Sequence, residues 1–214
     1  MHFSTLSNIV LFLQICFVLA SNAPMEISQE MREHFMRETF TALGSPCPRY
    51  PFGTVIVNHT ATPPKIICKG HNMNNIHNAY PQLHGEMAAI IECTKVLGTS
   101  GGWKDLSLYT NAEACPMCAS AIRWAGFKEY IYGTSIKTLI DHNWVQIEIS
   151  SHEVFQKSET LKSETAIIGS VLTSETDPLF AWQFSAHGQC PHGCMEVPRP
   201  GRGRCVPEDI GLEL

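Results

Sequence analysis

The chain has 214 residues, of which 44% are hydrophobic and 16% charged, a composition typical of globular proteins and unlike that of disordered chains. This length allows one domain with a substantial core, together with appendages. The formal net charge is −5 and no run of basic residues occurs, which argues against a nucleic-acid-binding protein because such proteins usually carry a Lys/Arg patch.

The first twenty residues form a segment of their own. Residues 9–20, IVLFLQICFVLA, are an apolar run of signal-peptide length that is too short to span a bilayer comfortably. Val18 and Ala20 are small enough for the positions before a cleavage site, although the preceding segment lacks Lys and Arg. We expect residues 1–20 to be a cleaved signal peptide and the protein to be secreted, without a membrane span after cleavage. An N-terminal membrane anchor is the alternative.

The segment after the signal peptide predicts a helix and then a hairpin. Residues 25–43 carry an apolar stripe at helical spacing, and Gly44 is a good stop. Residues 53–57 and 65–69 are rich in β-branched residues and read as two strands joined by a turn. The turn begins with Asn58-His-Thr, an N-glycosylation sequon.

A polar loop, residues 70–83, follows the hairpin and leads into His84, so it is expected to form one wall of a site. Two histidines of this loop, His71 and His77, are open to two interpretations. Each is either a functional residue, as a metal ligand or a substrate contact, or a solvated loop histidine. Beyond it the pattern alternates between helix and strand: helices at 86–97, from Cys115, 135–141 and 151–157, strands at 106–110 and 129–132, and a possible fifth strand at 145–149. This alternation predicts an α/β fold with a mixed sheet and helices on both faces.

The domain predicted for residues 25–185 is followed by a tail, residues 186–214, that is dense in Gly, Pro and Cys and is either disulfide-stapled or disordered. Two of the nine cysteines, Cys115 and Cys118, form a C-x-x-C pair, and Cys16 lies in the signal segment. In an oxidising compartment an even remainder suggests disulfides, whose pairing stays open. That remainder is Cys47, Cys68, Cys93, Cys190, Cys194 and Cys205. There are two alternatives to a full set of disulfides. Cys93 could be a buried free thiol, or the tail cysteines could form a second zinc site.

Two short motifs carry the chemistry. Cys115 and Cys118 have the spacing of a zinc-binding thiolate pair, and His84 supplies a third ligand of the right kind. Three protein ligands leave a tetrahedral position for water, as in a catalytic rather than a structural site. Glu86 lies two residues after the histidine, where a carboxylate can move that water's protons. The two motifs together match the zinc deaminase signature, H-x-E followed by P-C-x-x-C.

The same motifs make the chain resemble the cytidine deaminase-like superfamily, most closely its guanine, cytosine and tRNA adenosine deaminase branch. The resemblance covers residues 27–184 and includes the stretches PFG at 51–53, GHN at 70–72, HGE at 84–86 and CPMC at 115–118. It implies a three-layer α/β/α fold with a mixed five-stranded sheet and commonly a homodimer. It also implies zinc ligation by His84, Cys115 and Cys118, proton transfer by Glu86, and substrate binding by Asn72.

The substrate is less constrained than the chemistry. Residues 121–125, AIRWA, are more similar to guanine deaminases than to tRNA deaminases, and Ala114 stands where the family usually has proline. We expect a deaminase of a free nucleobase or a related small heterocycle, with guanine the leading candidate and no nucleic acid bound. Tyr80, Trp103 and Trp144 are candidates for a stacking face. The alternatives are a catalytically idle zinc module and a nucleoside or tRNA adenosine deaminase.

Overall fold

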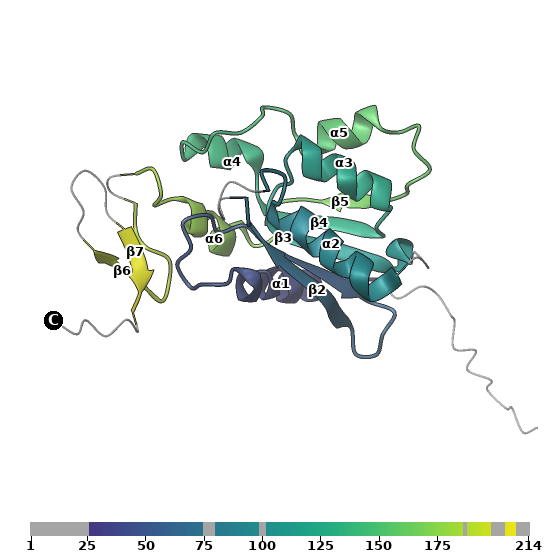
Figure 1. Cartoon of the computed structure of the whole chain (residues 1–214), viewed down its shortest axis with the longest axis horizontal. Helices are drawn as coiled ribbons and strands as arrows, with labels where there is room; N and C mark the ends of the chain where they lie inside the picture. Colours follow the sequence, from purple (N-terminus) through teal and green to yellow (C-terminus); the bar gives the residue numbers. More distant parts are fainter. Residues whose placement is uncertain (1–25, 75–79, 99–101, 186–187, 198–203, 209–214) are drawn as a thin grey trace, which may run out of the picture.

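A computed structural model describes residues 26–74, 80–98, 102–185, 188–197 and 204–208 of the chain (Figure 1). The predicted signal peptide and His77 lie outside these residues. Across the described part, none of the helices combines the length and the apolar character that a membrane crossing requires.

The centre of the molecule is a mixed five-stranded sheet, as the resemblance implied, and its strand order is β2-β1-β3-β4-β5. β1 pairs with β2 and with β3 in antiparallel fashion, whereas β3–β4 and β4–β5 are parallel. Parallel neighbours need long crossovers, and helices supply them here. The strands are β1 (Gly53–Asn58), β2 (Lys65–His71), β3 (Leu106–Ala112), β4 (Glu129–Thr134) and β5 (Ala166–Ile168).

Helices cover both faces of this sheet, which gives the predicted three layers (Figure 1). Neighbouring strand residues point to opposite faces, so Ile56 and Leu108 belong to one core while Val55 and Tyr109 belong to the other. The first core packs against α2 (Gly85–Leu97), α3 (Pro116–Ala125) and α5 (Ser151–Lys157). The second core packs against α1 (Gln29–Glu38). The remaining helices are α4 (Ile136–Asp141) and α6 (Thr173–Thr176), with 3₁₀ turns at Phe40–Ala42, Trp103–Asp105 and Asp177–Phe180.

Several predicted boundaries differ from the observed ones. The strand expected at 145–149 is wrong: these residues form no strand, Val145 is 96% exposed, and the fifth strand is β5 instead. Alternating apolar residues alone cannot make a strand without a partner, and the α4–α5 connection offers none. The first helix starts only at Gln29, because Ser28 caps it by accepting a hydrogen bond from the Met31 N–H.

Among the residues that the structure describes, three disulfides pair the six cysteines outside the C-x-x-C motif. Cys68–Cys93 joins β2 to α2, so the alternative of a free Cys93 thiol is wrong. Cys190–Cys205 closes the small hairpin formed by β6 (Cys194–Val197) and β7 (Arg204–Pro207). Cys47–Cys194 ties that hairpin to the segment before β1. Since all three tail cysteines are in disulfides, the alternative of a second zinc site there is also wrong.

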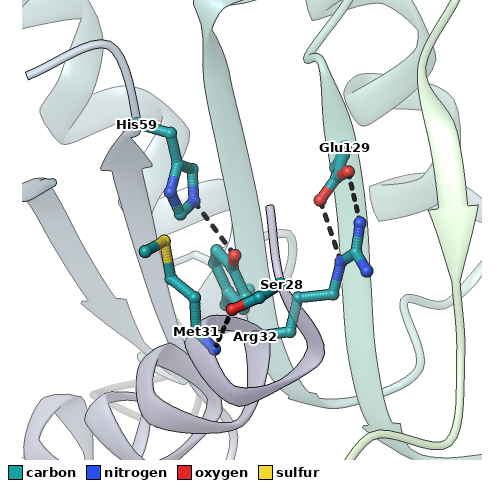
Figure 2. Close-up of polar contacts among 6 residues, drawn as sticks. Ser28, Met31, Arg32, His59 and Glu129 are labelled. Atoms are coloured by element: carbon teal, nitrogen blue, oxygen red, sulfur yellow. Dashed lines mark hydrogen bonds and ion pairs between the residues drawn. The ribbon is translucent and has the colours of Figure 1, made fainter. Parts of the chain in front are cut away.

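The α1 face of the sheet holds a buried histidine. His59, which is 3% exposed, has its Nε2 3.0 Å from the Tyr109 hydroxyl, and its Nδ1 is buried without a hydrogen-bond partner. Nearby, Arg32 donates to both carboxylate oxygens of Glu129, at 3.3 and 2.8 Å (Figure 2). Burial lowers the pKa of His59 from 6.5 to about 4, because the apolar surroundings disfavour the charged ring.

This histidine should make the protein sensitive to acid. Above pH 6.5 the ring is neutral in both the folded and the unfolded chain; below it the unfolded chain binds the proton first, so stability falls until about pH 4. We expect the free energy of unfolding to drop by roughly 2 kcal/mol more between pH 7.5 and 5 in the wild type than in His59→Gln, which does not titrate. Urea denaturation at the two pH values measures this difference. An equal drop in both proteins would contradict the assignment, and His152→Gln, at an exposed site, is the matched control.

Candidate metal centre and catalytic pocket

The first half of the site is the start of α2. His84 is the N-cap residue, with extended backbone angles, and its carbonyl accepts the first helical hydrogen bond from the Ala88 N–H at 2.9 Å. Glycines bring this helix close to the sheet: a Cβ on Gly85 would lie 2.9 Å from the Phe52 carbonyl oxygen, and one on Gly70 would lie 2.3 Å from the Ala89 nitrogen. Backbone contact this close is possible only without a side chain, which explains why glycine stands within both the HGE and GHN stretches.

The second half of the site is the start of α3. Cys115 is its N-cap residue, and Pro116 occupies the first turn, where a missing N–H costs nothing. The segment before it is fixed by the buried Tyr130, whose hydroxyl accepts a hydrogen bond from the Ala114 N–H at 2.7 Å. Cys118 lies one turn into the helix and is fully buried.

The structure brings His84, Cys115 and Cys118 together, with one potential ligand atom from each lying within 4.8 Å of the others. The His84 Nδ1 is 3.5 Å from the Cys115 Sγ. Typical bond lengths of about 2.3 Å for Zn–S and about 2.0 Å for Zn–N place the corners of a zinc tetrahedron roughly 3.5 Å apart. Both the donor types and their separation therefore fit Zn²⁺.

The electrostatics of the three ligands favour a thiolate. Hydrogen bonding from Cys118, and then from His84, lowers the pKa of the Cys115 thiol from 9.0 to about 4. The pKa of Cys118 is raised well above its usual value, mainly because Cys118 is the donor to Cys115 and is buried. The hydrogen bond with Cys115 raises the pKa of His84. A dication in place of these shared protons would let both sulfurs ionise, as zinc ligation requires.

Glu86 lies beside this group and is 5% exposed. Its pKa is raised from 4.5 to about 7, first because burial disfavours the carboxylate and second because of the negative charge on Cys115. A carboxyl group with such a pKa can both accept and release a proton near neutral pH, which is the property that a general acid–base group needs.

A cavity of about 320 Å³ opens above these residues. Asn72 lies in its wall, held by a hydrogen bond from its N–H to the Phe52 carbonyl at 3.0 Å and by one from its side-chain amide to the Asn74 Oδ1 at 2.9 Å. The cavity therefore brings Asn72 together with Glu86 and with two of the three potential metal ligands, His84 and Cys115. Its lining residues are Tyr50, Phe52, Asn72, Asn74, His84, Glu86, Glu113, Cys115, Trp144, Val145, Gln146 and Ile147.

Of the three aromatic residues considered for a stacking face, only Trp144 lines this cavity. Tyr80 is 54% exposed and does not line it, and Trp103 packs against Phe127, with ring centroids 5.2 Å apart. His71 is not among the lining residues either. Sequence reasoning missed Phe52 and Gln146, although the PFG stretch that contains Phe52 carried part of the resemblance.

Comparison with known proteins gives a consistent result. Residues 29–134 match the family model described as the cytidine and deoxycytidylate deaminase zinc-binding region. A guanine deaminase of Bacillus subtilis is 44% identical over 82 residues, which are 38% of this chain and 49% of that protein. A cytosine deaminase of Candida albicans is 33% identical over 89 residues, which are 42% of this chain and 55% of that protein. The match thus spans about half the length of these two relatives.

A longer match links the chain to a tRNA-specific adenosine deaminase of Streptococcus pyogenes, 33% identical over 115 residues that make up 52% of this chain and 67% of that protein. In fold, the chain is similar to a guanine deaminase from Nitrosomonas europaea, with a TM-score of 0.55 at 18% identity over 84% of this chain and 97% of the other. The matched region contains His84, Glu86, Cys115 and Cys118. The chain therefore belongs to the cytidine and deoxycytidylate deaminase family.

Proposed function

We propose that the protein is a zinc-dependent hydrolytic deaminase that acts on a free nucleobase, with guanine the leading candidate. The observation that carries this proposal is the buried Glu86 carboxyl group beside the His84, Cys115 and Cys118 group, in the floor of a cavity of about 320 Å³. A protein that used zinc only to hold its fold would need the ligands but not the acidic group next to them.

The chain's own residues divide the reaction between them. When bound by His84, Cys115 and Cys118, Zn²⁺ lowers the pKa of a water ligand towards neutrality. Glu86 would accept one proton from that water and give it to the ring nitrogen beside the attacked carbon. It would then accept the remaining proton from the newly added hydroxyl group and give it to the departing amine. The overall change replaces the C–NH₂ group with C=O and releases ammonia, with one water consumed.

The cavity favours a small, flat substrate. Its lining includes the rings of Phe52 and Trp144, whose centroids lie 5.2 Å apart, and the side-chain amides of Asn72 and Gln146. Aromatic faces suit a planar base, while amide groups can read its edge. The Bacillus subtilis relative is a guanine deaminase, and a solved structure of similar fold is a complex with 8-azaguanine. The net charge of −5 provides no general attraction to a polynucleotide.

The deciding experiment is ammonia release from guanine, adenine, cytosine, their nucleosides and a short RNA hairpin, at low and high salt. We expect the highest kcat/KM for guanine, with little dependence on salt. Preference for the RNA with a steep salt dependence would favour the tRNA deaminase alternative, since phosphate contacts are screened by salt. No activity on any of these compounds would favour the idle zinc module.

Asn72→Ala should weaken recognition of the base. The side chain lines the cavity in a fixed orientation, so its loss removes hydrogen bonds to the substrate without disturbing the metal ligands. We expect kcat/KM to fall because about 1–3 kcal/mol of transition-state stabilisation is lost. The zinc content should not change. Steady-state kinetics on guanine measure the effect, and Gln82→Ala, at an exposed position of the same loop, is the control. Unchanged kinetics for Asn72→Ala would remove this residue from the binding site.

We also propose that the protein is secreted. In the described part of the chain, six cysteines form three disulfides and Cys115 and Cys118 alone are free, which fits an oxidising compartment. The Asn58 side chain accepts hydrogen bonds from the N–H and the hydroxyl of Thr60, which folds the sequon into a compact turn. A secreting eukaryotic host should release protein that begins near Ser21, carries glycan on Asn58 and has two reactive thiols after zinc removal. Intact Met1 on intracellular protein with nine reactive thiols would contradict this, because that chain would keep Cys16 and form no disulfides.

The expected homodimer remains a proposal as well. α2 and α3 lie side by side on one face of the sheet (Figure 1), and both expose large apolar side chains. Ile91 is 41% exposed on α2, and Trp124 is 75% exposed on α3. Burying them against a second copy would remove apolar surface from water. Light scattering should give the mass of two chains for the wild type and of one chain for Trp124→Glu; a monomeric wild type would overturn the proposal.

A further inference from the structure

We propose that Asn111 and Glu113 are positioning residues that hold the two halves of the pocket wall in place, each from a position just before the metal ligand Cys115. The inference rests on the proposed function in so far as the cavity is taken to be the substrate site. The two halves come from distant parts of the chain: Tyr50 and Phe52 precede β1, whereas residues 144–147 connect α4 to α5.

Asn111 holds the first half. It is fully buried at the end of β3, where its Oδ1 accepts a hydrogen bond from the Gly53 N–H at 2.9 Å and its Nδ2 donates to the Pro51 carbonyl at 2.6 Å. The β1–β3 backbone register ends at the pair of Thr54 and Thr110, so the Asn111 side chain extends the pairing beyond the strand ladder. Both bonds flank Phe52, and they therefore fix the backbone on either side of this pocket-lining ring.

Glu113 holds the second half. It is 6% exposed, and its Oε2 accepts a hydrogen bond from the Ile136 N–H at 2.9 Å. Its Oε1 accepts from the N–H and the hydroxyl of Ser151, at 2.8 and 2.7 Å. Ile136 and Ser151 are the first residues of α4 and α5. One carboxylate thus anchors both helices that flank the connection 142–150, which carries Trp144 into the pocket.

The two halves meet at Trp144. Its ring contacts Phe52 edge to face, with centroids 5.2 Å apart, and Tyr50 at 5.9 Å. Its indole N–H donates to the Phe180 carbonyl at 2.9 Å, but no strand pairing fixes the connection itself. Asn111 and Glu113 lie four and two residues before Cys115. The five consecutive residues 111–115 therefore fix the position of both walls relative to the metal centre. Loss of either anchor should loosen one wall and leave the ligands in place.

Hydrogen–deuterium exchange of the intact, zinc-loaded protein tests this directly. In Glu113→Gln, one amide group cannot accept every bond that the carboxylate accepted, so the amides of Ile136, Ser151 and 142–150 should exchange roughly tenfold faster. In Asn111→Leu, the faster exchange should instead be found at Gly53 and its neighbours. Zinc content should stay at the wild-type value in both variants. A uniform increase along the chain, loss of zinc, or no change would overturn the proposal.

Kinetics on the base provide a second readout that a purely structural role would not produce. With the wall loosened and the Glu86 region intact, KM should rise roughly tenfold in each variant while kcat changes by less than about threefold. A fall in kcat at unchanged KM would contradict the positioning role. If the wild type deaminates no base, the proposed function fails, but the exchange pattern still tests the two anchors. If the wild type is active and the local pattern is absent, only the anchors are wrong.

Discussion

Glu86→Gln is expected to abolish nearly all turnover while zinc and fold are retained. The amide has almost the shape of the carboxyl group but cannot accept and return a proton. Because Glu86 is buried, a solvent water molecule cannot easily take over this proton transfer. General acid–base catalysis typically contributes about 10²–10⁴-fold, and Glu86 is proposed to act at several steps, so kcat should fall by at least roughly 10³-fold. Ammonia release on the best substrate, with metal analysis of the same sample, measures both halves of the expectation.

Glu92→Gln is the matched control for this change. Glu92 lies on the same helix but is exposed and forms an ion pair with Lys95 at 2.8 Å. Its replacement should leave both kcat and zinc content at the wild-type value, because exposed ion pairs contribute little to stability. Wild-type turnover by Glu86→Gln would refute the mechanism. Loss of zinc in that variant would instead show that Glu86 helps to bind the metal, rather than serving only in proton transfer.

Removal of a zinc ligand is expected to have the largest effect on stability. His84→Ala and Cys118→Ser should lose bound zinc, since two remaining ligands hold the ion much more weakly than three. The folded chain then loses the stabilisation that zinc provides by binding only the native state, about 4 kcal/mol when free zinc is a thousandfold above Kd. Metal analysis after dialysis and thermal unfolding with and without a chelator measure the two effects.

The chelator provides an internal check on this expectation. It should lower the melting temperature of the wild type towards that of His84→Ala and leave the variant unchanged. His152→Ala, which replaces an exposed histidine on α5, should keep zinc and respond to the chelator as the wild type does. Full zinc occupancy in both ligand variants would refute the ligand assignment.

Much of the site could be predicted from sequence because its chemistry depends on residue type and short spacing. Only a few side chains bind zinc, and the H-x-E and C-x-x-C spacings place them at the starts of two helices. Asn72 was reached through the resemblance of the GHN stretch, and it lies in the cavity wall. Trp144 was a candidate for a stacking face, but its contact with Phe52 could not be predicted, because the two residues are 92 positions apart in the chain and meet only in the folded protein.

By itself, the sequence determined the α/β fold class, a mixed sheet and the set of chemically reactive side chains, because local periodicity and motif spacing are properties of neighbouring residues. The expectation of five strands rested on the family resemblance. The tertiary structure decided which cysteines pair: Cys93 and Cys68 are brought together because α2 packs on β2, and Cys47 is joined to Cys194 across 147 residues. It also decided that residues 145–149 are not a strand. A strand needs a hydrogen-bonding partner, and the residue pattern does not show whether one is within reach.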